Sequence, residues 1–214
     1  MTRETRISFP SGKENLEGIV ATPTISEPPW SGIVISHPDP WMGGTMDSPV
    51  IRTISSKLTT HEIATLRYNY RGVGESTGSY EEGKGESEDA RNAFDLLNEW
   101  PDINENKLGL IGYSFGASMA ALTTQSETSV SGLVLISPPL GLLDSEILKT
   151  ISIPAIIIGG EKDLMTPPEK LVSAQAALPK TTQLRLIQNA DRSWSDGADS
   201  LADTITKFFQ RLWE

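Results

Sequence analysis

The clearest chemical signal in the 214-residue sequence is GYSFG, a G-x-S-x-G pattern at residues 112–116. It follows the apolar stretch KLGLI and opens the small-residue stretch FGASMAALTTQ. A sharp turn from a strand into a helix needs glycines beside it and lifts its serine hydroxyl above the sheet. We therefore expect Ser114 to be a nucleophile and the N–H of Phe115 to stabilise an oxyanion. The alternative is a glycine-rich turn with an incidental serine.

A second polar segment, HPDPWMGG at residues 37–44, follows the apolar stretch GIVIS. In a parallel sheet this loop supplies the other oxyanion donor beside the serine turn. Its two prolines have no N–H, so the donor is expected to be Asp39, Trp41 or a later residue. A rigid proline turn with a packed His37 side chain is the alternative.

A candidate acid lies in GGEKDLMTPPE, which follows the apolar stretch PAIII. A carboxylate at this place can orient and stabilise a catalytic imidazolium. Asp163 has the better position, because a helix start follows it, and Glu161 is the alternative. A solvated loop acid or a helix cap explains the same residues without chemistry. Another glycine-containing segment, RGVGES at residues 71–76, follows ATLRYNY and is interpreted as a tight turn braced by Arg71.

A histidine that could serve as the catalytic base is missing from its expected position. In IQNADRSW, at residues 187–194, Arg192 stands where the pattern leads us to expect a histidine. Arginine has no free acceptor and a pKa above about 12, so it does not accept a serine proton. Of the two histidines, His61 lies between a helix end and a strand start, at the opposite edge of the sheet. His37, or Asp39 near it, is then the candidate for an alternative base.

The elements that must position these residues alternate along the chain. TRISFP and LEGIVATP predict an antiparallel hairpin. Six strands then alternate with five helices: SGIVISH, ATLRYNY, KLGLIGYS, VSGLVLISPP, PAIIIGG and TQLRLIQ, with helices in DSPVIRTISSKLTTHE, residues 86–100, FGASMAALTTQ, PPEKLVSAQAAL and DSLADTITKFFQRLW. This order predicts a mostly parallel sheet with helices on both faces and ligands beyond the carboxyl ends of the strands. We expect one domain, residues 1–214, with residues 138–150 as a minimal cap.

Composition narrows the function classes. The formal net charge of −10 disfavours nucleic acid and anionic membranes as partners. The absence of cysteine excludes disulfides and thiolate metal sites and favours a cytoplasmic location. The longest apolar runs are far shorter than the roughly 20 residues of a membrane span. Without a metal-ligand cluster or a G-x-G-x-x-G after the first parallel strand, we expect no metal and no cofactor. The chain is expected to be a monomer or a homodimer.

Taken together, the sequence resembles the α/β-hydrolase superfamily, especially its small, nearly capless bacterial serine hydrolases related to dienelactone hydrolases and prolyl peptidases. HPDPWMGGTMDSPV, LRYNYRGVGESTGSYEEGKGESEDA, LIGYSFGA and GGEKDLMTPPE stand in the order and spacing of that family. The resemblance implies a three-layer α/β-hydrolase fold and cleavage of esters or related acyl bonds. It also implies Ser114 as nucleophile, Asp163 as acid and Phe115 N–H as oxyanion donor. HPDP in place of HPHP, and NADR in place of a GADH-type motif that puts Arg192 at the base position, depart from the family.

These departures leave three hypotheses open. His37 or Asp39 acts as the base of a serine hydrolase with an atypical or weakened mechanism. Otherwise the chain is a catalytically impaired relative that binds a small acyl or anionic ligand, with Arg192 paired with Asp163 or facing the pocket. In the third hypothesis Arg192 points to solvent and the site is weakly active. Tyr113, Trp41 and Trp194 are the expected pocket residues, and the two tryptophans could equally pack under loops.

Overall fold

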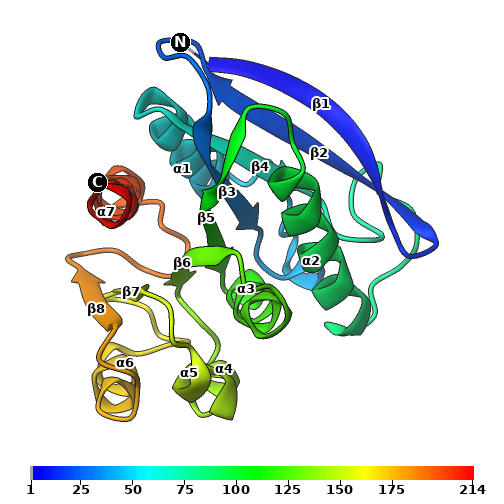
Figure 1. Ribbon diagram of the computed structural model, residues 1–214. Helices are drawn as coiled ribbons and strands as arrows, with labels where there is room; N and C mark the ends of the chain where they lie inside the picture. The colour runs from blue at the N-terminus through cyan, green and yellow to red at the C-terminus, as the bar shows by residue number, and fades with distance from the viewer. Residues whose placement is uncertain (1) are drawn as a thin grey trace.

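A single eight-stranded sheet organises the chain (Figure 1). The computed structural model describes residues 2–214. The strand order is β1-β2-β4-β3-β5-β6-β7-β8, and the strands span β1 Thr2–Ser11, β2 Glu14–Pro23, β3 Trp30–Ser36, β4 Ile63–Tyr68, β5 Ile103–Tyr113, β6 Val130–Ile136, β7 Ala155–Gly160 and β8 Thr182–Ile187. The hairpin of β1 and β2 is antiparallel and joins the sheet through an antiparallel β2–β4 pair, while β4, β3 and β5 to β8 pair in parallel.

Helices cover both faces of this sheet, which makes three layers. The helices are α1 Pro49–Thr60, α2 Lys84–Asn98, α3 Phe115–Ser126, α4 Leu140–Leu143, α5 Glu146–Thr150, α6 Pro168–Gln175 and α7 Ala198–Trp213, with a 3₁₀ turn η1 at Pro40–Met42. α1 and α7 pack together on one face, and α2, α3 and α6 lie on the other.

The period of two along the buried strands divides the core into two clusters. Ile33 and Ile35 of β3 contact the α1 and α7 side, and Val34 between them contacts the α2 and α3 side. Successive side chains of a strand point to opposite faces, so a strand buried on both faces has few polar residues. The apolar runs of the sequence are therefore explained by this double covering.

The predicted architecture is confirmed, and one segment contains structure that was not predicted. Residues 138–150 contain two short helices, α4 and α5, that the sequence did not indicate; they pack against α6 and α3. The role of this segment as a cap stays a prediction. Helix α1 begins after Ser48, and the preceding Asp47 forms an ion pair of 2.5 Å with the buried Arg67.

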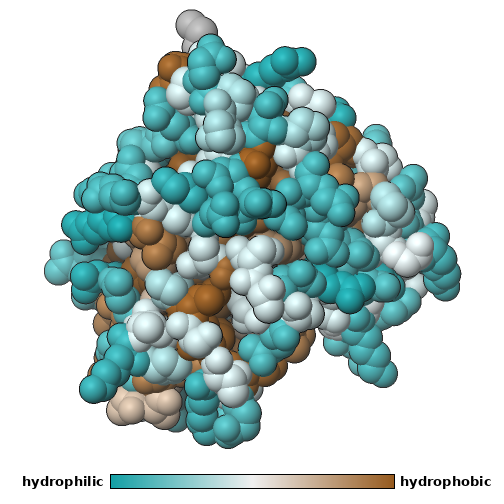
Figure 2. Space-filling view, in the orientation of Figure 1, coloured by the Kyte–Doolittle hydropathy of each residue, from teal (hydrophilic) through white to brown (hydrophobic). Residues whose placement is uncertain are grey.

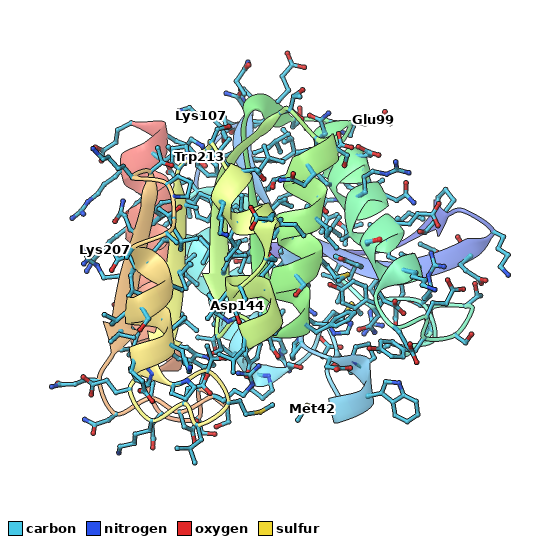
Figure 3. All side chains as sticks on the ribbon, turned by 90° about the horizontal axis from the view of Figure 1, so that it is seen from below. Met42, Glu99, Lys107, Asp144, Lys207 and Trp213 are labelled. Atoms are coloured by element: carbon cyan, nitrogen blue, oxygen red, sulfur yellow. The ribbon has the colours of Figure 1, made fainter. Side chains whose placement is uncertain are left out.

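All parallel strands run in the same direction, so the loops that follow them gather at one edge of the sheet. Figure 3 shows Met42, in the turn after β3, at one end of the molecule and Lys107 and Glu99 at the opposite end. The loops after β3, β5, β7 and β8 contain the residues with candidate chemistry, so the topology alone brings them to the carboxyl edge.

The face of the molecule seen in Figure 2 is mostly hydrophilic, with small hydrophobic areas between the polar residues. Among the helices of residues 2–214, none combines the length and the apolar character that a membrane crossing requires.

One buried ion cluster fixes the loop between β4 and α2. The Arg71 guanidinium lies 2.8 Å from the fully buried Asp89 carboxylate and 3.2 Å from both Glu81 and Glu88. Asp89 also accepts hydrogen bonds from the Arg71 backbone N–H and the Ser11 hydroxyl. Hydrogen bonding to Asp89 is the largest cause that raises the pKa of Arg71. The cluster supports the interpretation of Arg71 as a brace.

We predict that Asp89→Ala lowers the free energy of unfolding by about 3–5 kcal/mol, because it leaves the buried Arg71 without its closest counter-charge. Urea denaturation measures the loss. The matched control is Glu88→Ala, which removes a half-exposed partner of the same guanidinium and should cost about 1 kcal/mol or less. Equal losses in the two variants would contradict the assignment of Asp89 as the central partner.

Candidate active site

Ser114 occupies a strained turn between β5 and α3. Its backbone has φ 55° and ψ −115°, a region that residues other than glycine rarely adopt and that costs of the order of 1–3 kcal/mol. Its N–H donates to the carbonyl of Ile136 at 2.8 Å, and its own carbonyl accepts from Ala117 N–H at 2.9 Å. The neighbouring strand and the first turn of α3 therefore hold the serine in this conformation.

The two glycines of the pattern make this turn possible by close backbone approach. A Cβ atom at Gly112 would overlap the carbonyl oxygen of Gly116, and one at Gly116 would overlap the carbonyl oxygen of Ser36. Ser36 ends β3, so the same contact brings the loop after β3 beside the serine turn. Each of the two positions thus requires glycine, as the sequence indicated, because a Cβ atom there would overlap a backbone carbonyl oxygen.

Arg192 places its guanidinium between the serine and the acid. Its Nη2 donates to Ser114 Oγ at 2.7 Å, and its Nη1 donates to Thr166 Oγ1 at 3.0 Å and to Asp163 Oδ2 at 3.4 Å. The Asp163 side chain is fully buried, and 18% of the Arg192 side chain is exposed. Of the hypotheses for Arg192, this geometry matches pairing with Asp163 and differs from a side chain that points to solvent.

Asp163 is fixed by the chain that follows it. Its Oδ1 accepts the N–H groups of Met165 at 2.9 Å and Thr166 at 3.0 Å. The Thr166 hydroxyl donates to the carbonyl of Pro138 at 2.7 Å, which leaves its lone pairs for Arg192. Sequence reasoning missed Thr166. Its place three residues after the acid, just before a helix start, was the available signal.

Tyr113 and Trp194 do not line an open pocket as predicted. The Tyr113 hydroxyl donates to the backbone carbonyl of Arg192, and burial raises the pKa of Tyr113 to about 12. Tyr113 therefore anchors the Arg192 loop. The side chain of Trp194 is buried in the core cluster beneath α1 and α7. The sequence placed Trp194 after a strand and Tyr113 within the end of one, but it did not show which way the side chains turn.

Both ring nitrogens of His37, the candidate alternative base, have backbone partners. Its Nε2 accepts the Tyr70 N–H at 3.3 Å, which leaves Nδ1–H to donate to the Pro38 carbonyl at 2.7 Å. Complete burial lowers the pKa of His37 to about 4, so the ring is neutral at neutral pH. Asp39, the other candidate, accepts the N–H of Trp41 at 2.9 Å. Within residues 2–214, neither side chain makes a hydrogen bond to Ser114.

The same contacts decide between the expected oxyanion donors. Asp39 takes up the Trp41 N–H, so Trp41 does not supply the donor. The N–H groups of Asp39 and Phe115 have no hydrogen-bond partner within the part of the chain that the structure describes. These two remain the predicted donors, one from each loop beside the serine.

We predict that burial of neutral His37 makes the fold acid-sensitive. A group whose folded pKa is lowered loses its contribution as pH falls, because the unfolded chain takes up the proton first. Between pH 7 and pH 5 this amounts to about 2 kcal/mol for a fall from 6.5 to about 4. The free energy of unfolding should therefore decline over this range in the native protein. His37→Gln keeps a hydrogen-bond donor and an acceptor but does not titrate, so it should flatten the decline. Equal declines in the native protein and in His37→Gln would contradict the prediction.

The comparisons with known proteins agree on the fold. Residues 33–211 match the family model described as an alpha/beta hydrolase domain. An uncharacterized protein of Rickettsia prowazekii is 30% identical over 161 residues, which are 74% of this chain and 66% of that protein. The chain spans 66% or less of the length of the curated relatives it matches.

Two solved structures cover almost the whole chain. A protein of unknown function from Agrobacterium tumefaciens has a TM-score of 0.86 at 25% identity and covers 97% of this chain and 95% of its own. An alpha-beta serine hydrolase homologue from Coxiella burnetii has a TM-score of 0.83 at 26% identity and covers 95% of this chain and 96% of its own.

Proposed function

We propose that this chain, which belongs to the α/β-hydrolase family, is a serine hydrolase-type protein for small acyl esters or related acyl compounds, with slow turnover. Ser114 is the nucleophile, and Arg192 positions its hydroxyl without deprotonating it. The observation that carries the proposal is the 2.7 Å hydrogen bond from Arg192 Nη2 to Ser114 Oγ, made while the same guanidinium contacts Asp163. The guanidinium thus takes the place of the imidazole in a serine–histidine–aspartate arrangement.

The remaining parts support acyl chemistry at the serine. The hydroxyl oxygen attacks the acyl carbon as solvent takes its proton, and the N–H groups of Phe115 and Asp39 stabilise the oxyanion. The ester C–O bond then breaks and the alcohol leaves with a proton from water. A second water hydrolyses the acyl-serine, which releases the acid and restores the Ser114 hydroxyl. Arg192 stabilises negative charge on Ser114 Oγ, but solvent must take the proton. Loss of a triad base lowers turnover by about 10⁶, and about 10³–10⁴ over water remains from the oxyanion hole and binding. Activated esters are therefore the expected substrates of the native protein.

A second candidate function is a catalytically impaired relative that binds a small acyl or anionic ligand. Ser114 Oγ accepts a hydrogen bond from Arg192, and in residues 2–214 its own proton has no acceptor. A hydroxyl held in this way is a good ligand-binding group and a poor nucleophile. The two candidates differ in whether Ser114 becomes covalently modified.

We predict that Arg192→His raises the rate of ester cleavage by at least about a hundredfold, because an imidazole in this place can accept the serine proton. The pH profile of the variant should rise with an inflection near 6.5, the ordinary pKa of histidine. The native protein should lack that inflection, since neither histidine of the chain is hydrogen-bonded to Ser114 in the described residues 2–214. A panel of activated esters assayed from pH 5 to pH 9 measures both properties.

Ser114→Ala, assayed beside both proteins, is the control for cleavage elsewhere on the surface. A fluorophosphonate probe tests the nucleophile directly, with slow labelling expected of the native protein and fast labelling of Arg192→His. Complete absence of labelling in both would reject the hydrolase in favour of the binding protein. An unchanged rate in Arg192→His would show that more than the base has been lost.

A further inference from the structure

Arg192 still has hydrogen-bond donors that its protein partners do not use. An arginine side chain has five N–H donors. Nη1 makes two of the observed bonds and Nη2 makes one, so Nε–H and the second Nη2–H have no partner within residues 2–214. The exposed 18% of this side chain shows that solvent reaches it. With the unpaired N–H groups of Phe115 and Asp39, the site offers several donors to one small anion.

A series of aromatic side chains begins at Phe115, the residue that follows Ser114. We call it the aromatic ledge: Phe115, next to the nucleophile, lies 5.9 Å from Tyr80 between ring centroids, and Tyr80 lies 6.1 Å from Trp41. Trp41 is 79% exposed, yet its backbone is fixed by η1, which Asp39 caps at one end and Gly43 ends in a left-handed conformation. A large exposed aromatic ring on an ordered turn, connected through Tyr80 to the residue that follows Ser114, favours a role in ligand contact.

The charges of Asp39 and Arg192 determine which end of an anionic ligand would lie at Arg192. Asp39 lies close enough to Tyr80 to raise the pKa of Tyr80, after burial as the larger cause. A negative group on the ledge would meet this carboxylate, whereas a negative group at Arg192 would meet a cation. The loop after Asp163 exposes the aliphatic residues Leu164 and Met165. Among the exposed large hydrophobic side chains of residues 2–214, Trp41 is the aromatic one, so a planar ring would pack best on its side of the serine.

We propose that the site binds an aromatic monocarboxylate, with the carboxylate at Arg192 and Ser114 and the ring on the aromatic ledge. The inference rests on the proposed function in one respect: such an acid is the product that Ser114 would release from an aromatic carboxylic ester. Binding of the acid itself requires no turnover. The two proposals can therefore be tested separately on the same protein.

The experiment is calorimetric titration of the full chain with 2-naphthoate, with hexanoate and neutral 2-naphthalenemethanol as comparison ligands. Native protein should bind 2-naphthoate more tightly than either comparison ligand. Trp41→Ala should weaken 2-naphthoate about tenfold and leave hexanoate unchanged, while Trp41→Phe keeps most of the affinity. Leu164→Ala, at a position that is 91% exposed in the loop after Asp163, is the matched control and should leave the affinity for 2-naphthoate unchanged.

Arg192→Met should abolish the preference for the carboxylate over the alcohol. Because it also leaves Asp163 unpaired, its folding is checked by denaturation. Trp41→Ala, at an exposed position, tests the ledge without that complication. Equal binding of 2-naphthoate to native protein and Trp41→Ala, or no binding to native protein, would overturn the inference. Trp41-dependent binding without any labelling of Ser114 would support the inference and reject the hydrolase. Labelling of Ser114 without Trp41-dependent binding would support the hydrolase and reject the inference.

Discussion

The site depends on one constraint: the buried carboxylate of Asp163 needs a positive partner, and Arg192 is the cation that the structure provides. Removing one member of a buried pair leaves an uncompensated charge, which costs more than the pair contributes. Because the same guanidinium also binds Ser114 and Thr166, satisfying the acid fixes the environment of the serine. The guanidinium that neutralises Asp163 is therefore also the group that positions the hydroxyl of the candidate nucleophile Ser114.

The fold holds this arrangement with rigid backbone contacts. The strained turn at Ser114 persists because β6 and α3 bind its peptide groups and because Gly112 and Gly116 allow backbone contacts that any side chain would prevent. Tyr113 ties the Arg192 loop to the end of β5. The serine turn and the Arg192 loop are thus both anchored within a few residues of the sheet edge.

Much of the fold was predictable, because alternation of strands and helices along the chain determines a parallel sheet whose loops meet at one edge. The same rule brings Ser114, Asp163 and Arg192 together. The directions of side chains within the loops were not predictable. Local patterns placed Trp194 at the right edge, but core packing turns it inward. Likewise His37 and the Trp41 N–H are occupied by partners that only the folded backbone brings near.

Arginine at position 192 also changes how the site responds to protons. An imidazole alternates between neutral and charged forms near neutral pH, and that alternation lets it take and return the serine proton. Arginine side chains stay charged in proteins and present a fixed set of donors. The property that prevents proton transfer is the one that suits a permanent receptor for anions. Under the two proposals made above, the residue at position 192 would decide whether an acyl group is transferred efficiently or a carboxylate is held.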